Sequence, residues 1–305
     1  MTTSHAYQEV LETSRRVNWR LEDLVGEGHA LDFSRPFLPE TYARTAPLGF
    51  LTAKEKLLLN HIRTRGYMAL FELVESFVVP FMTGLSTSCV GDEAYRAPAL
   101  RNFVDEEEKH RELFRRLLRE FDRHFPVQVG FIGPAEEIIR TVLAHSPLAI
   151  TIATLGLEWM SQAHYTEAVH DDSNLDPQFK RLLRHHWLEE AQHAKLDTYV
   201  LQSLAGAATT EAIDKGVNEY FEIGAFLDAG LKAQVGLDLA ALEAASGRCF
   251  AESERTQFLE VQHAAQRWTF LGTAMGNKNF LQALGAISAE GARRVSEAAA
   301  AFRLN

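Results

Sequence analysis

Two segments carry the most informative pattern in the chain: DEEEKHRELF at residues 105–114 and HHWLEEAQHAKLD at residues 185–197. Each contains a glutamate followed three positions later by a histidine, namely Glu107 with His110 and Glu190 with His193. Residues three apart lie on one face of a helix, so each pair presents a carboxylate oxygen and an imidazole nitrogen to the same point. The segments therefore predict two helices that carry paired metal-ligand side chains.

The residues around each pair predict which way it faces. In the first segment the pair belongs to a stripe that also contains Leu100, Phe103, Phe114, Leu117 and Phe121. In the second segment the stripe contains Phe179, Leu183, Val200 and Leu204. An apolar stripe at helical spacing is the face that a helix turns toward the core. Both pairs are therefore predicted to point inward.

Two further carboxylates complete the pattern. Glu72 in FELVESF precedes the first pair, and Glu158 in LGLEWMSQ lies between the pairs. Glu75, one turn beyond Glu72, is an alternative at the first position. Six such ligands with four negative charges would neutralise two divalent cations, whereas the same charges buried without cations would be very costly. The order Glu, Glu-x-x-His, Glu, Glu-x-x-His is typical of dinuclear iron or manganese sites in ferritin-like bundles.

Glu-x-x-His alone is weak evidence, because the chain contains it at 107–110, 167–170, 190–193 and 260–263. The pair at 167–170 lies at a helix end beside two aspartates, and the pair at 260–263 shares its row with polar residues. A rival set remains open, comprising Glu158, Glu190 with His193, Glu222, and Glu260 with His263. We favour the first set because both of its pairs lie in apolar stripes.

Few prolines and glycines interrupt the long stretches of helical periodicity, which favours an all-α fold. The predicted helices span about 6–24, 53–84, 92–124, 147–171, 176–205, 209–246, 252–284 and 287–302. No linker or repeat divides the chain, so residues 1–305 are predicted to form a single domain. We expect a ferritin-like four-helix bundle at about 53–205. An additional N-terminal helix precedes it, and covering helices at about 209–302 follow it.

Composition limits the environment and the partners. The formal net charge of −10 opposes binding to nucleic acid or to an anionic membrane surface. Two cysteines are too few for a disulfide framework, and the N-terminal residues lack the apolar segment of a signal peptide. These features favour a cytoplasmic protein with neither a nucleic-acid nor a membrane partner.

The sequence resembles the p-aminobenzoate N-oxygenase family of di-iron oxygenases, within the ferritin-like superfamily. The resemblance covers roughly residues 50–205 and rests on the six positions, on the 35-residue separation of Glu72 and Glu107, and on His186, four residues before Glu190. It implies that His186 is a third histidine ligand and that the protein is a homodimer. From the residues alone, the facing direction favours His186 over His185 as the ligand, and a supporting role that hydrogen-bonds without touching metal stays open.

These observations predict a di-iron oxygenase with O2 as co-substrate and an external electron donor. The mixed carboxylate and imidazole ligands suit two iron ions, and they also allow manganese or a mixed Mn/Fe pair. The resemblance implies N-oxygenation of an amine, with an arylamine as the leading small-molecule substrate. One alternative is a metal-handling or iron-oxidising protein without an organic substrate. Another is a helical interaction protein that retains a vestigial site.

Overall fold

The computed structural model describes residues 3–26, 28–87 and 95–304, and within these ranges every regular element is helical. The all-α prediction is therefore confirmed. In chain order the main helices are α1 (Thr3–Ser14), α2 (Glu40–Ala43), α3 (Ala53–Thr87), α4 (Arg96–His124), α5 (Ala135–Leu143), α6 (Pro147–Ala163), α7 (Pro177–Gly206), α8 (Thr210–Ser246), α9 (Glu252–Arg267), α10 (Thr273–Met275), α11 (Lys278–Ile287) and α12 (Ala289–Ala300). Three short segments, η1 (Leu21–Asp23), η2 (His164–Val169) and η3 (Trp268–Gly272), complete the chain.

Four long helices carry the predicted site residues. Helix α3 packs along α4, α6 packs along α7, and α4 also contacts α7. The predicted start of α7 is confirmed, because the side chain of Asp176 accepts a hydrogen bond from the backbone N–H of Phe179 and Pro177 occupies the first turn. Ser146 and Pro147 begin α6 in the same way. These caps fix the starts of the two helices that supply the second half of the site.

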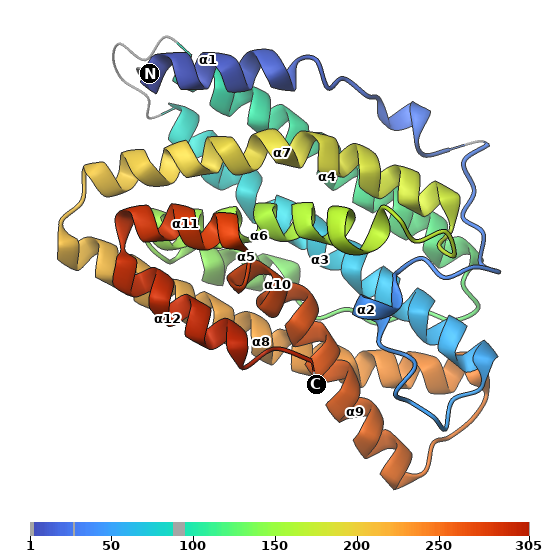
Figure 1. The fold of residues 1–305 in the computed structure, drawn as a ribbon. Coiled ribbons are helices and arrows are strands. Elements are labelled where there is room, and N and C mark those ends of the chain that lie inside the picture. Colours follow the sequence, from blue (N-terminus) through green and yellow to red (C-terminus); the bar gives the residue numbers. More distant parts are fainter. Residues whose placement is uncertain (1–2, 27, 88–94, 305) are drawn as a thin grey trace.

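The remaining helices cover the four central ones on two sides. Helix α1 lies along α4 and α7 at the top of Figure 1, and α8 runs along the opposite side against α6 and α3. Helix α9 packs on α8, and α11 and α12 form a pair that contacts α6 and α10. The C-terminal third of the chain therefore lies on the α6 side of the molecule, as the predicted covering helices require.

Several predicted boundaries are wrong, and the structure shows why. The first helix ends at Ser14, because the chain turns there so that Trp19 stacks on His110 with ring centroids 6.0 Å apart. The predicted helix at 252–284 breaks at Asn277, whose side chain caps α11. Helix α3 continues through Pro80 to Thr87, since Pro80 is exposed and the carbonyl freed by its missing N–H can face solvent.

Two differences concern segments rather than boundaries. The short helix α5 was not predicted, although Ile138, Ile139 and Val142 give it an apolar face. The predicted start of the 92–124 helix lies partly outside the described residues, and the described helix α4 begins at Arg96. Neither difference moves a predicted ligand, because all of those lie well inside α3, α4, α6 and α7.

By length and composition, helix α3 could cross a membrane, and 56% of its most apolar window is buried inside the protein. A second candidate exists only if α5 and the α6–η2 helix, which are bent by 120° relative to each other, are counted as one span. The burial of α3 fits its position as a central helix of the bundle. The core helix of a globular protein meets the same criteria.

Candidate metal centre

The two helices with Glu-x-x-His sequences meet in the core. His110 on α4 places its Nδ1 atom 3.0 Å from Oε1 of Glu190 on α7. His193 on α7 places its Nδ1 atom 2.9 Å from Oε1 of Glu107 on α4. At most 2% of any of these four residues is exposed. The histidine of each helix therefore lies against the glutamate of the other, and the structure brings both predicted pairs together.

Each imidazole is also held by a carboxylate from the opposite helix. The Nε2 atom of His110 lies 2.9 Å from Glu189, and the Nε2 atom of His193 lies 3.0 Å from Glu106. A carboxylate beside Nε2 keeps the ring proton there and leaves the Nδ1 lone pair free to bind a cation. Each supporting glutamate directly precedes the inward glutamate of its own helix. The repeated Glu-Glu-x-x-His sequence is the signal that could have identified this crossed support.

The supporting glutamates are themselves anchored. Glu189 accepts a hydrogen bond of 2.5 Å from Nζ of Lys109, which also lies 4.1 Å from the ring centroid of Trp19. Glu106 accepts a hydrogen bond of 2.5 Å from the hydroxyl of Ser14 at the end of α1. The N-terminal segment therefore reaches the residues that orient both histidines. No local sequence pattern indicated these contacts, because they join residues about 90 positions apart.

Glu72, predicted as the first inward carboxylate, does not join the cluster. Its Oε1 atom accepts a hydrogen bond of 2.7 Å from Nε of Arg115, and 21% of its side chain is exposed. Glu75 is 4% exposed and has its Oε1 atom 3.8 Å from Nε2 of His186. The prediction of Glu72 at this position is therefore corrected to Glu75, the alternative one turn along. Glu75 shares a helix face with Phe71, whose ring packs on His186, and that contact fixes the rotation of α3.

His186 faces the cluster as predicted. Its Nε2 atom lies 2.8 Å from Oε1 of Glu190, and it is 4% exposed. The rings of Phe71 and Phe114 meet it edge-on. The adjacent His185 points away and places its Nδ1 atom 2.7 Å from the carbonyl of Arg181. The inward direction of His186 is thus confirmed, and its role as a ligand stays a prediction.

Glu158 on α6 approaches the cluster from the remaining side. It is 6% exposed, and among the described residues its Oε2 atom has no hydrogen-bond partner. Together with Glu75 and Glu190 it bounds a small cavity of about 20 Å³ beside the cluster. The predicted carboxylate is therefore brought to the edge of the centre rather than into the tightest group of donor atoms.

The donor atoms form two overlapping groups in which all atoms lie within 4.8 Å of one another. One group is Glu75, His110, His186 and Glu190, and the other is Glu107, His110, Glu190 and His193. Because Glu190 belongs to both groups, its two oxygens could contact two neighbouring cations, whereas the Nδ1 atom of His110 could bind only one of them. Among the described residues, both oxygens of Glu107 and the Nδ1 atoms of His110 and His193 are buried without a hydrogen-bond partner. Such atoms are costly to bury, and a bound cation would satisfy them. The cluster can hold a metal.

Electrostatics within the cluster are strongly coupled. Burial and the neighbouring charges of Glu107 and Glu190 raise the pKa of Glu75 well above its usual range. Burial and Glu190 do the same to the pKa of Glu158. Burial opposes ionisation of His110, yet Glu190 and the other nearby carboxylates raise its pKa well above the ordinary histidine value. Burial opposes ionisation of Glu107 and Glu190 as well, yet the neighbouring histidines hold the pKa of each below its usual range. Nearby positive charge therefore favours the ionised form of these two carboxylates.

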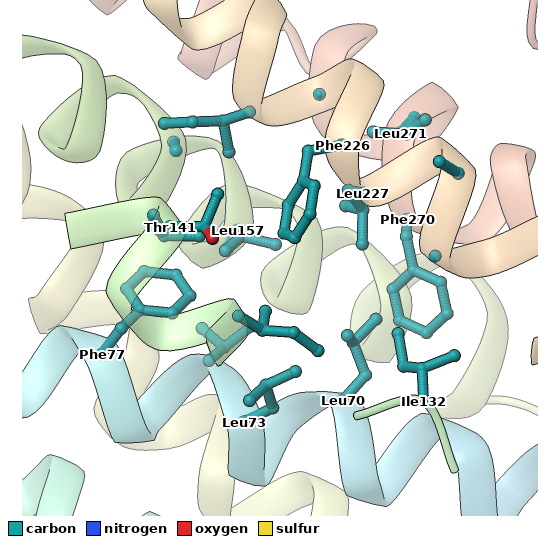
Figure 2. Close-up of a pocket in the computed structure, with 18 of the residues that line it drawn as sticks. Leu70, Leu73, Phe77, Ile132, Thr141, Leu157, Phe226, Leu227, Phe270 and Leu271 are labelled. Atoms are coloured by element: carbon teal, nitrogen blue, oxygen red, sulfur yellow. The ribbon is translucent and has the colours of Figure 1, made fainter. Parts of the chain in front are cut away.

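A large cavity lies beside the centre. Its volume is about 680 Å³, and it is a solvent-open cavity bounded by α3, α5, α6, α8 and the η3–α10 segment, with exposed residues such as Phe226 and Ala233 in its lining. Figure 2 shows hydrocarbon side chains facing into it, with Leu70, Leu73 and Phe77 on α3 and Phe226 and Leu227 on α8. A cavity of this size is typical of a site for a drug-sized molecule.

The other Glu-x-x-His sequences do not contribute. His170 is exposed and pairs with Asp171 at 2.7 Å, as expected for a helix end. His263 pairs with Asp228 at 2.9 Å on the surface of α9. Glu222 of the rival set is exposed on α8. The structure therefore does not assemble the rival set.

Comparison with protein-family models and with curated proteins finds no match to this chain.

Proposed function

We propose that the protein is a dinuclear iron oxygenase of the ferritin-like class that uses O2 to oxidise a small organic substrate. The observation that carries the proposal is the pair of overlapping ligand groups joined by His110 and Glu190. The crossed support of the two imidazoles by Glu106 and Glu189 favours metal binding over a simple ion-pair network, because it directs Nδ1 of each ring inward.

The donor set suits iron. Carboxylate oxygens and imidazole nitrogens are hard to intermediate donors, which favour iron or manganese over copper(I) or a thiolate-bound zinc. We propose His186 as an additional nitrogen ligand in the group that contains Glu75. Glu158 would provide a carboxylate on the cavity side of the centre. We leave manganese and a mixed Mn/Fe pair as outcomes of metal analysis.

The leading reaction is N-oxygenation of an amine, with an arylamine as the first class to test. One oxygen atom of O2 is added to the amine nitrogen to give a hydroxylamine, and the other leaves as water with two protons and two electrons from an external donor. Bound iron would supply the activation of O2. The residues of the chain hold the metals, orient the imidazoles and exclude water, because the ligand cluster is almost fully buried.

The alternative is a metal-handling or iron-oxidising protein that has no organic substrate. The cavity of about 680 Å³ beside Glu158 favours the oxygenase, because iron storage requires no apolar chamber. A storage protein would load iron far beyond two ions per chain. An interaction protein with a vestigial site would bind no stoichiometric metal. A homodimer and an external electron donor complete the proposal.

The test combines metal loading and turnover. Purified protein is loaded anaerobically with Fe²⁺, metal per chain is measured, and O2 is added with a reductant and a panel of amines whose products are analysed by mass. We expect about two iron ions per chain and a gain of one oxygen atom in at least one amine. Replacing Glu107 or Glu190 by Ala should abolish loading of at least one metal. Retention of two tightly bound metals in both variants would refute the ligand assignment.

His186 needs a separate comparison, because its inward direction does not establish ligation. The ring of His186 contacts Phe71 and Phe114 beside the cluster. The His186→Ala variant should therefore leave the fold largely intact and change the optical spectrum and rate of iron oxidation. The His185→Ala variant is the matched control, because His185 points away from the cluster. An unchanged spectrum and rate in His186→Ala would assign His186 a supporting role.

A further inference from the structure

The lining of the large cavity restricts what can occupy it. Among the described residues that line it there is no lysine, arginine or histidine, and the one carboxylate is Glu137. The side chain of Glu137 is 61% exposed and lies 3.5 Å from Arg140, so this carboxylate belongs to the solvent-facing part of the lining. Burial raises the pKa of Tyr220, so its phenol is neutral. A charged group lying against the hydrocarbon wall of this chamber would lose part of its hydration without gaining a partner.

The lining has few polar side chains, namely Glu137, Thr141 and Tyr220. The hydroxyl of Thr141 donates a hydrogen bond of 2.8 Å to the carbonyl of Glu137 within α5. Thr141 lies on the α5 side of Figure 2, opposite the Leu70 and Phe270 end. The interior therefore offers hydrocarbon surface from α3, α6 and α8 and almost no free hydrogen-bonding capacity.

The chamber adjoins the small cavity beside the candidate metal centre. The small cavity beside the cluster shares Leu70, Val74, Leu157 and Phe270 with the large one, and we call these four residues the gate. On its other side the small cavity is bounded by Glu75, Glu158 and Glu190. Its volume of about 20 Å³ is close to that of one water molecule. These four side chains therefore lie between the chamber and the cluster, where a terminal group of an occupant would come nearest to the centre.

We infer that this cavity is the substrate chamber and that the substrate is an uncharged molecule with an extended apolar body, which places one terminal group at the gate. The assignment of the chamber to catalysis rests on the proposed function, whereas the apolar selectivity follows from the lining alone. A small anionic amine such as p-aminobenzoate is a poor occupant, because its carboxylate would lie against hydrocarbon. The substrate class is thus narrower than that of amines in general.

The test uses two fluorescent probes with the same ring skeleton. N-Phenyl-1-naphthylamine is uncharged, and 8-anilinonaphthalene-1-sulfonate differs from it by one sulfonate. Binding is measured by fluorescence titration of the full chain, both without metal and after loading. We expect one N-phenyl-1-naphthylamine per chain, bound at least about tenfold more tightly than the sulfonate, which is the effect of about 1.4 kcal/mol of desolvation. Equal affinities, or tighter binding of the sulfonate, would overturn the inference.

Matched variants locate the bound probe. Ala233 lines the chamber and Ala225 does not, although both are exposed alanines on α8. Ala233→Trp should weaken binding of the uncharged probe at least tenfold, and Ala225→Trp should leave it unchanged. Thr141→Trp fills the chamber from α5 instead of α8. It should weaken binding as well, which would show that the result for Ala233→Trp is not caused by a local change in α8. Unchanged binding in both Ala233→Trp and Thr141→Trp would show that the probe binds elsewhere.

The two proposals can fail separately. Probe binding requires neither metal nor O2. If the oxygenase proposal fails, the preference for the uncharged probe over the sulfonate therefore still stands. Protein loaded with paramagnetic Co²⁺ should quench the bound probe more than protein loaded with Zn²⁺, because the gate adjoins the cluster. Equal probe fluorescence in the Co²⁺-loaded and Zn²⁺-loaded proteins would show that the bound probe is far from the metal centre. It would refute the assignment of the chamber to catalysis. Probe binding that disappears as the chain self-associates would show that a second copy of the chain covers the chamber. That result would overturn the inference.

Discussion

Glu75 and Glu72 lie one turn apart on α3 but face different surroundings. Glu75 is enclosed by the cluster, whereas Glu72 is held by Arg115 at the edge of the helix. Replacing Glu75 by Gln removes an anionic donor without changing its size, so we predict that iron loading falls from about two ions per chain to about one. Glu72→Gln should still load two. Metal analysis after desalting measures both, and equal loading of the two variants would return Glu72 to the ligand set.

The residues that orient the imidazoles have their own measurable effect. Glu106 holds His193, whereas Glu108, two positions along α4, pairs with Arg111 at the surface. Removing a carboxylate that orients a histidine ligand lowers metal affinity by about 10–100-fold in known sites. Glu106→Ala should show a loss of this order in a competition titration with a chelator, and Glu108→Ala should bind metal normally. Unaltered affinity in Glu106→Ala would make the contact with His193 dispensable.

The residues explain how far sequence could define the site. Glu107, His110, Glu190 and His193 were predictable because each pair lies in an apolar stripe that sets its direction. FELVESF is apolar on both sides of its glutamates, so it could not distinguish Glu72 from Glu75, and only the packing of Phe71 on His186 decides. The contact of Ser14 with Glu106 spans 92 positions and left no local signal.

At the scale of helices, α8 crosses α6 closely at one glycine. A Cβ atom on Gly216 would lie 2.8 Å from Cβ of Leu148, whereas one on Gly236 of the same helix would have no neighbour within 4 Å. We predict that Gly216→Ala lowers the free energy of unfolding by about 1–3 kcal/mol through overpacking. Gly236→Ala should raise it by up to about 1 kcal/mol, because alanine favours the helix. Urea denaturation of the two variants measures both, and a stabilised Gly216→Ala would show that the crossing can relax.

The helices also show where periodicity is sufficient and where it is not. The long central helices were predictable because their apolar stripes run for many turns and their starts carry capping residues such as Asp176. Helix α5 has nine residues, too few for its apolar side chains to stand out from a loop. The break before α11 depends on Asn277, whose Nδ2 atom donates to the carbonyl of Trp159 on α6. Tertiary contact, rather than local preference, ends that helix.

At the scale of the whole molecule, one buried histidine joins the central helices to the C-terminal segment. His164 follows α6, and its Nδ1 atom accepts a hydrogen bond of 2.9 Å from the hydroxyl of Tyr67 on α3. Its Nε2 atom lies 2.9 Å from the carbonyl of Thr269 in η3, which assigns the ring proton to Nε2. The neutral ring satisfies both contacts. A second proton would have to occupy the Nδ1 atom, and the hydroxyl of Tyr67 would then have to accept from it instead of donating.

Burial therefore lowers the pKa of His164 from 6.5 to about 4. Because the unfolded chain binds this proton at a higher pH than the folded chain does, the stabilisation is fully present above about pH 6.5. It is lost as the pH falls from 6.5 through about 4. Between pH 7 and pH 5 this linkage amounts to about 2 kcal/mol of unfolding free energy.

The His164→Asn variant carries no such proton, so its stability should fall less than that of the unmodified protein over this interval, by about that amount. The exposed His170 provides the control, since His170→Asn should keep the full dependence. Chemical denaturation of the metal-free proteins at both pH values measures the difference. Identical pH dependence in His164→Asn and the unmodified chain would mean that His164 accepts its proton in the folded state as readily as in the unfolded one.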